Sequence, residues 1–233
     1  MPSALIVKVG STMPELAARR GDYEDWIAAG LDGVPVEVCR VRDGDALPSP
    51  EVPRAVVVTG SSALVTDREP WSEATGRWLL EVLARGTPFL GICYGHQLLA
   101  HALGGVVGAT PRGREIGTIE VELTDEGSRD PLFEGLGPRL VVSASHRQSV
   151  LRLPEGARRL AGNALSEHQA YAVGERAWGV QFHPEWDHEV VRAYVEARRA
   201  ILAEEGLDPD ALARAVRPSA HGAAILARFA RLI

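Results

Sequence analysis

A cysteine at position 93 lies between Gly91 and Gly95, where an apolar strand-like run gives way to a helical pattern. Small residues on either side of a nucleophile permit a tight turn that projects its side chain from the end of a sheet. The N–H groups and the dipole at the start of the following helix stabilise a thiolate. This spacing predicts a cysteine nucleophile. Cys39 has no flanking glycines and is interpreted as a small buried side chain.

A thiolate nucleophile needs a partner that accepts and returns a proton, and histidine is suited to this near neutral pH. Among seven histidines, His183 is the best placed, because it ends the apolar run 178–182 and is followed by Pro184 and Glu185. Residues two apart in an extended chain project to the same side, so Glu185 can reach the His183 ring. A carboxylate there orients the ring and stabilises the imidazolium. We therefore predict a triad of Cys93, His183 and Glu185.

The segment around His183 also contains potential metal ligands, namely Glu185, Asp187 and His188. Pro184 interrupts the helical spacing that would place two ligands on one face, and no second cluster completes a site. Two cysteines are too few for a cysteine-based zinc site or a disulfide scaffold. We predict no metal and no cofactor.

The segments that must position these residues alternate between short β-branched runs and helical patterns. Such alternation predicts the α/β class, with a mostly parallel central sheet covered by helices on both faces. Strands are expected at residues 5–9, 34–41, 55–59 and 88–92, and helices at 23–31, 71–85 and 94–103. The predicted nucleophile thus stands between a buried strand and a helix.

The second half of the chain has a different pattern. Short alternating strands near residues 116–123, 140–143 and 177–182 are expected to include small antiparallel additions to the sheet. A helical tail follows, with one apolar stripe over 190–201, a helix start at Asp208-Pro209 and a last short helix from Pro218-Ser219.

Length and composition limit the remaining possibilities. The chain has 233 residues, 45% of them hydrophobic, so it can bury a substantial core, and disorder is excluded as the main state. We expect a single domain over 1–233, with a core at 1–189 and a helical C-terminal extension at 190–233. A net charge of −6 disfavours nucleic-acid and anionic-membrane partners. The lack of a spanning or signal-like segment and the few cysteines predict a cytoplasmic protein.

Two segments resemble the signature pair of the class I glutamine amidotransferases of the Cys-His-Glu triad type. They are Gly-Ile-Cys-Tyr-Gly-His-Gln at 91–97 and Gly-Val-Gln-Phe-His-Pro-Glu at 179–185. Two motifs in the expected order are far more specific than a lone cysteine turn. The resemblance covers about residues 50–190 and is closest to stand-alone, GMP-synthase-like members. It implies a flavodoxin-like fold.

The resemblance also implies a reaction. Cys93 would attack the side-chain amide of glutamine, releasing ammonia and leaving a glutamyl thioester that water hydrolyses. By resemblance, the oxyanion is held by the backbone amides of Tyr94 and of the Gly60-Ser61 turn. Gln97 lies one helical turn past the nucleophile and is expected to bind substrate.

The Ser145-His146 pair matches the family's Ser-His pair, whose backbone helps to hold the amino-acid end of the substrate. In the family an acidic residue commonly stands two positions after that histidine, whereas this chain has Gln148. The change puts recognition of the substrate's α-amino group in doubt. Glu167 or another acid is a candidate replacement.

Several functions remain open at this point. The leading prediction is glutamine hydrolysis with ammonia passed to a separate synthetase, because the roughly 45 residues after Glu185 are too few for a nucleotide-binding domain. The nearest alternative is a γ-glutamyl peptidase or amide hydrolase with the same triad, which Gln148 mildly favours. A catalytically quiet binding protein would not need all three triad residues. A cysteine-containing α/β-hydrolase would place its acid before its histidine, which is the reverse of the order here.

Overall fold

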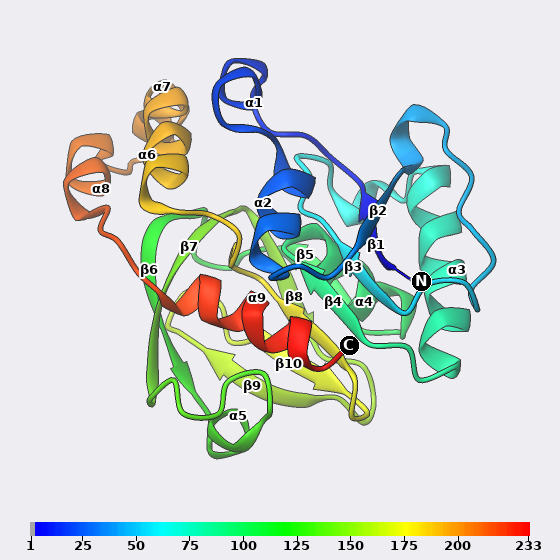
Figure 1. Cartoon of the computed structure of the whole chain (residues 1–233). Coiled ribbons are helices and arrows are strands. Elements are labelled where there is room, and N and C mark those ends of the chain that lie inside the picture. The colour runs from blue at the N-terminus through cyan, green and yellow to red at the C-terminus, as the bar shows by residue number, and fades with distance from the viewer. Residues whose placement is uncertain (1–2) are drawn as a thin grey trace.

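A computed structural model describes residues 3–233 and contains a nine-stranded mixed sheet (Figure 1). In spatial order its strands are β2 (Val36–Arg40), β1 (Ala4–Lys8), β3 (Ala55–Val58), β4 (Phe89–Ile92), β11 (Ala177–Val180), β10 (Ala170–Val173), β9 (Arg158–Gly162), β6 (Glu115–Leu123) and β7 (Arg139–His146). The strands from β2 to β11 pair in parallel, and those from β11 to β7 pair antiparallel. A two-stranded antiparallel sheet, β5 (Val106–Ala109) with β8 (Gln148–Arg152), lies beside them.

Both faces of the parallel strands are covered by helices, which explains their uninterrupted apolar runs. On one face, α3 (Pro70–Ala84) and α4 (Tyr94–Ala102) pack side chains such as Leu79 and Leu98 against the sheet. On the other, α2 (Tyr23–Gly30) and α9 (His221–Arg231) do so with side chains such as Ile27 and Phe229. The predicted α/β class, with a mostly parallel central part and helices on both faces, is confirmed.

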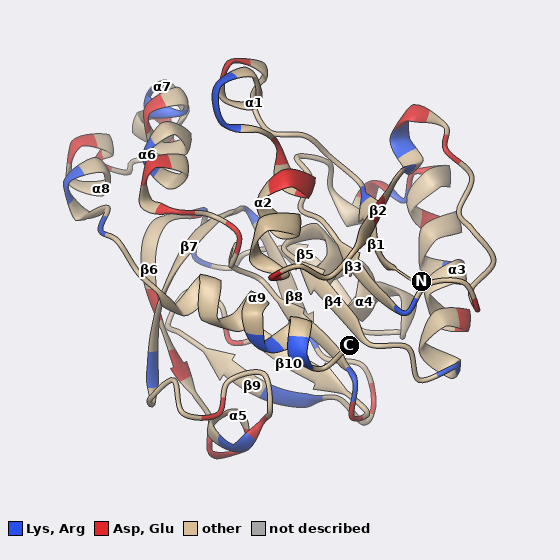
Figure 2. Ribbon diagram, in the orientation of Figure 1, with Lys and Arg blue, Asp and Glu red and all other residues tan. Residues whose placement is uncertain are grey.

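The helical C-terminal segment differs in detail from its predicted form. The stripe expected as one helix over 190–201 is divided at Arg198 into α6 (His188–Ala197) and α7 (Arg199–Glu204). The predicted start at Asp208 is confirmed, since its carboxylate caps α8 (Pro209–Ala215). The last helix, α9, begins at His221 rather than at Pro218-Ser219. Figure 2 shows that α6, α7 and α8 carry both basic and acidic residues.

Two short helices complete the architecture, α1 (Pro14–Arg20) before α2 and α5 (Asp125–Arg129) between β6 and β7. Within residues 3–233, no helix combines the length and the apolar character needed to cross a bilayer.

The parallel arrangement gathers three loops at one end of the sheet. Gly60 follows β3, Cys93 follows β4 and His183 follows β11, and these three strands are direct neighbours. The carboxyl ends of parallel strands are where open α/β sheets bind their ligands. The sheet topology therefore places the candidate residues together.

Candidate active site

The turn at Cys93 is a strained backbone junction between β4 and α4. Cys93 has φ 50° and ψ −95°, a conformation that L residues rarely adopt. Its N–H donates to the carbonyl of Val180 at 2.8 Å, which fixes the turn to β11. A Cβ on Gly91 would lie 2.5 Å from the backbone carbonyl atoms of Gly95, and one on Gly95 would lie 2.5 Å from the carbonyl oxygen of Val58. Glycines on both sides are thus what this close-packed turn requires.

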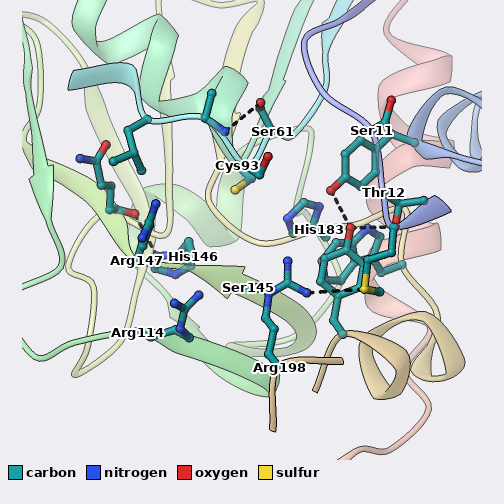
Figure 3. A pocket seen from close by; sticks show the side chains of 18 of the residues that line it. Ser11, Thr12, Ser61, Cys93, Arg114, Ser145, His146, Arg147, His183 and Arg198 are labelled. Atoms are coloured by element: carbon teal, nitrogen blue, oxygen red, sulfur yellow. Dashed lines mark hydrogen bonds between the residues drawn. The ribbon is translucent and has the colours of Figure 1, made fainter. Parts of the chain in front are cut away.

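His183 follows β11, the strand that pairs with β4, and its side chain lies near that of Cys93. Its N–H donates to the carbonyl of Ser143 at 2.8 Å, so the segment after β11 is held against β7. A Cβ on Gly60 would lie 2.8 Å from Cε1 of His183 and 3.7 Å from Cβ of Cys93, so both side chains stand over this glycine. Figure 3 shows Cys93 and His183 lining one cavity.

Glu185 holds the far side of the His183 ring. Its Oε1 lies 2.7 Å from Nδ1 of His183, and both side chains are buried. Burial by itself lowers the pKa of His183, but the charges of Glu185 and Cys93 and hydrogen bonds to both outweigh it and raise that pKa to about 9. The ring is therefore favoured in its protonated form, beside a sulfur in position to be its counter-ion.

An aromatic cluster covers the His183 ring. The indole of Trp186 stacks on the ring with centroids 3.7 Å apart and planes 12° apart, and Tyr23 stacks at 6.0 Å. The hydroxyl of Tyr23 lies 2.7 Å from that of Tyr194, which in turn lies 2.8 Å from Oγ1 of Thr12. An aromatic face stabilises a cation by its quadrupole. The cluster both restricts the ring and favours its charged form.

The cavity in front of Cys93 has a volume of about 400 Å³, which is within the range of small-molecule sites. Of the residues expected to bind substrate or oxyanion, Ser61, Gln97, Ser145 and His146 line it. Gly60 lies directly beneath the Cys93 and His183 side chains. The structure therefore gathers segments of the chain that are more than 100 residues apart.

Tyr94 occupies a different position from its neighbours. Its side chain points away from the cavity and into the packing of α3, with its hydroxyl 2.6 Å from Oγ of Ser72 and its ring stacked on Trp71. Its backbone N–H belongs to the first residue of α4, where no intrahelical acceptor exists. Of the polar groups of Tyr94, only this backbone N–H is in position to donate to a ligand bound at Cys93.

Gln97 is fixed by contacts to the protein. Its Nε2 donates to the carbonyl oxygen of Gln148 at 2.9 Å and to Oε1 of Gln181 at 3.0 Å. The remaining amide atom, Oε1, is the one that a ligand in the cavity can contact, and it can accept an N–H.

His146 belongs to a second buried histidine–carboxylate pair. Its Nε2 lies 2.9 Å from Oε2 of Glu115, and its Nδ1 lies 3.0 Å from the carbonyl oxygen of Gln148. Glu115 also accepts from Asn163 and Gln169. This network fixes the backbone between His146 and Gln148 at the wall of the cavity. Sequence reasoning missed Glu115, because nothing in its local pattern links it to a residue 31 positions later.

The replacement acid expected at Glu167 is not part of the site. Glu167 is exposed and pairs with Arg159 at 3.1 Å, away from the cavity. Three arginines line the cavity instead, Arg114, Arg147 and Arg198, and sequence reasoning missed all three. They lie far apart in a chain rich in arginine, so no local signal distinguished them.

Three other residues considered from the sequence, His96, Asp187 and Cys39, have contacts that suit structural roles. His96 is fully buried, and this burial lowers its pKa to about 3, so it is neutral. Asp187 caps α6 and pairs with Arg20 at 2.6 Å rather than turning toward His183. Cys39 is buried in the core, and burial raises the pKa of its thiol.

The chain is similar to several known proteins. A family model described as glutamine amidotransferase class-I matches residues 29–201. A GMP synthase [glutamine-hydrolyzing] of Aeropyrum pernix is 38% identical over 192 residues, which cover 80% of this chain and 33% of the relative. In Methanothermobacter thermautotrophicus, one subunit of a GMP synthase [glutamine-hydrolyzing] is 36% identical over 148 residues, which cover 61% of this chain and 77% of that protein. The chain thus spans about a third of the length of the former and most of the latter.

A solved structure of a glutamine amidotransferase from Thermotoga maritima superposes with a TM-score of 0.77 at 24% identity. The match covers 99% of this chain and 97% of that one, and at this identity it shows a shared fold.

Proposed function

Because this chain belongs to the class I glutamine amidotransferase family, we propose that it hydrolyses a side-chain carboxamide of the glutamine type with Cys93 as the nucleophile. The observation that carries the proposal is the pairing of a strained, glycine-flanked Cys93 with a His183–Glu185 pair at the end of the adjacent parallel strand. The curated relatives that hydrolyse glutamine support the substrate class.

In the proposed reaction, Sγ of Cys93 attacks the amide carbon, and the carbonyl oxygen becomes an oxyanion. The His183 imidazolium donates its proton to the amide nitrogen, and the carbon–nitrogen bond breaks. Ammonia is released, and a γ-glutamyl thioester remains on Cys93. Neutral His183 then takes a proton from water, and the resulting hydroxide equivalent attacks the thioester carbon. The carbon–sulfur bond breaks, which releases the carboxylic acid and restores the Cys93 thiolate beside the His183 imidazolium. Glu185 keeps the ring in the orientation and protonation that both steps need.

The proposed oxyanion donors are backbone N–H groups of Tyr94 and of the Gly60-Ser61 turn. Their positions beside Cys93 support this role, and none of the hydrogen bonds among residues 3–233 is donated by the N–H of Gly60 or Ser61. Loss of one such donor typically costs about 10²–10³ in rate. Gln97, whose Oε1 can accept, is proposed to bind the amide –NH₂ of the substrate.

We propose that the ammonia is taken up by a separate synthetase. The relative from Methanothermobacter thermautotrophicus, which matches over most of its own length, is named as a subunit of a GMP synthase, and this supports a two-protein arrangement. The alternative is simple hydrolysis of a γ-glutamyl compound with no acceptor.

The test is release of ammonia from glutamine and from a panel of γ-glutamyl amides and peptides by purified protein. We expect turnover that is lost in Cys93→Ala and retained in Cys39→Ala, since Cys39 lies in the core away from the cavity. Equal rates in the two variants would refute the proposal. Hydrolysis of γ-glutamyl peptides without any of glutamine would favour the peptidase alternative.

A further inference from the structure

The amide of Gln97 is held in one orientation by two acceptors. Its Nε2 donates to the carbonyl oxygen of Gln148 at 2.9 Å and to Oε1 of Gln181 at 3.0 Å. A backbone carbonyl only accepts hydrogen bonds, so the Gln97 atom beside it is the nitrogen, and both N–H bonds of this nitrogen are used within the protein. The Oε1 atom of Gln97 makes no hydrogen bond among residues 3–233 and is not one of their fully enclosed atoms. This oxygen is therefore the part of Gln97 that is open to the cavity.

The first acceptor, the Gln148 carbonyl, is also held by a buried histidine–carboxylate pair. Nδ1 of His146 lies 3.0 Å from that carbonyl oxygen, so this nitrogen carries a hydrogen. Nε2 of His146 lies 2.9 Å from Oε2 of Glu115, and both side chains are at most 2% exposed. The carboxylate also accepts from the amide nitrogens of Asn163 at 2.6 Å and Gln169 at 2.5 Å. Three donors around one carboxylate favour its ionised form, so the ring donates from both of its nitrogens.

The second acceptor, Oε1 of Gln181, is supported from the same carboxylate. Gln169 is fully buried and donates from Nε2 to Oε2 of Glu115. The backbone carbonyl of Gln169 accepts the N–H of Gln181 at 2.8 Å, which fixes the chain beyond β11. Glu115, at the start of β6, is thus connected by hydrogen bonds to both supports of the Gln97 amide.

We propose that Glu115 is a positioning residue for substrate binding and that it acts through Gln97. The network keeps Oε1 of Gln97 turned toward the cavity, where it accepts an N–H of the substrate. A half-turn of the amide would place this oxygen against the Gln148 carbonyl, and two acceptors in contact without a hydrogen are unfavourable. The proposal rests on the proposed hydrolysis at Cys93 and adds the residue that prepares its substrate site.

The variant Glu115→Gln removes the charge and nearly keeps the shape. An amide offers one accepting oxygen in place of two, so the three donors around position 115 cannot all stay bonded, and His146 need no longer donate to Gln148. The Gln97 amide then loses its fixed orientation. We expect KM for glutamine to rise by about tenfold, the effect of one poorly made hydrogen bond. We expect kcat to stay within about threefold, because Cys93 and His183 are not members of the network.

A double-mutant cycle tests whether Glu115 acts through Gln97. Gln97→Leu removes the accepting oxygen and should itself raise KM by about tenfold or more. Adding Glu115→Gln to this variant should raise KM by less than about threefold further, since the group that Glu115 orients is already absent. A residue with a merely structural role would give effects that multiply. Glu122→Gln is the matched control, because Glu122 lies on the same strand, is exposed and pairs with Arg139. It should leave kcat and KM unchanged.

A second variant interrupts the network at another member. In His146→Gln the side chain no longer donates from the position of Nδ1 to the Gln148 carbonyl. We expect the same rise in KM with little change in kcat, and again no further effect when Gln97→Leu is present. This variant decides the proposal if urea unfolding shows that Glu115→Gln is not folded.

The measurement is ammonia release by the whole chain over a range of glutamine concentrations. An unchanged KM in folded Glu115→Gln, or a loss confined to kcat, would overturn the proposal. A KM in the double variant equal to the product of the two single effects would overturn the action through Gln97. Each of these results leaves hydrolysis at Cys93 intact. Wild-type protein that releases no ammonia from glutamine would instead overturn the proposed function, and the role of Glu115 with it.

Discussion

At the scale of single residues, the central feature is the charge state of His183. Three neighbours contribute to it, since Glu185 and Cys93 supply negative charge and Trp186 an aromatic face. Burial lowers the pKa of His183, but the charges of Glu185 and Cys93 and hydrogen bonds to both outweigh it and raise that pKa to about 9. A protonated ring is what the amide nitrogen of the substrate needs when its bond to carbon breaks.

The first prediction concerns pH. Because the pKa of His183 is raised, its imidazolium persists below about pH 9 and is lost above it, so kcat/KM should fall on the alkaline side near pH 9. In Glu185→Gln a source of the upward shift is removed, and the alkaline limb should move to lower pH. The rate should also fall by about 10²–10⁴-fold, as for other triads without their acid. A pH–rate profile with an unmoved limb would show that Glu185 does not set the charge of His183.

Trp186 gives a second prediction as a positioning residue. Replacing it by Leu removes the face stacked at 3.7 Å on His183, so kcat/KM should fall by between about 2-fold and 30-fold. The alkaline limb should also move to lower pH, which a purely structural defect would not cause. Trp186→Tyr retains an aromatic face and should restore both quantities in large part. Identical pH profiles for wild type and Trp186→Leu would contradict the prediction.

The sequence predicted the three polar residues Cys93, His183 and Glu185 but not the residues that surround them. Cys93, His183 and Glu185 stand out because glycine spacing and a strand end are local signals. Trp186 directly follows the motif and could have been suspected on that ground. The arginines of the cavity and Glu115 come from segments whose proximity only the folded chain reveals.

At the scale of elements, the junction between β4 and α4 is the feature that presents Cys93. Its geometry depends on the absence of side chains at two places where backbones touch. Gly95 lies in α4 with Val58 of β3 against it, so the helix start and the sheet are in direct contact. This contact leaves no space for even one methyl group.

A glycine pair tests this dependence. Gly95→Ala places a Cβ 2.5 Å from the carbonyl oxygen of Val58, so the backbone must move, and we expect a loss of about 1–3 kcal/mol in unfolding free energy with a large loss of activity. Gly76→Ala is the control in the interior of α3, where the Cβ would meet Leu98 at 3.5 Å, an ordinary contact. That variant should gain about 0.5–1 kcal/mol and retain activity. Urea unfolding that ranks the two variants in the opposite order would contradict this account.

Elements with strong patterns were predicted, and those without were not. The apolar runs of β1, β3 and β4 are buried on both faces and read directly as strands. In contrast, β9 has the sequence Arg-Arg-Leu-Ala-Gly, in which no alternation marks a strand. It is a strand because β10 and β6 flank it, and such pairing is a property of the fold rather than of the segment.

At the scale of the whole molecule, the C-terminal segment is tied into the core. The sequence suggested a core at 1–189 with an added helical extension, yet α9 contributes Ile225, Leu226 and Phe229 to the main apolar cluster beneath the sheet. Figure 1 shows α9 lying along that face beside α2. We therefore propose that 190–233 is required for folding and that 1–233 acts as one unit.

Phe229 provides the corresponding stability prediction. It is fully buried and packs edge-on against Trp178 of β11, so Phe229→Ala should lower the unfolding free energy by about 3–5 kcal/mol. Ile201→Ala, on the exposed side of α7 in the same segment, should change it by less than about 0.5 kcal/mol. Urea unfolding of the two variants measures both. A small effect of Phe229→Ala would mean that the core does not depend on the C-terminal helix.

The most direct test of the central claim is to locate the acyl group during turnover. Protein is mixed with substrate and quenched in acid, in which a thioester survives. The protein is then digested, and the masses of its peptides are measured by mass spectrometry. The account predicts a glutamyl-type mass increase on the peptide that contains Cys93 in the wild-type protein and in Cys39→Ala, and none in Cys93→Ala. Ammonia release by wild type with no acyl group on Cys93, or with the group on Cys39, would contradict it.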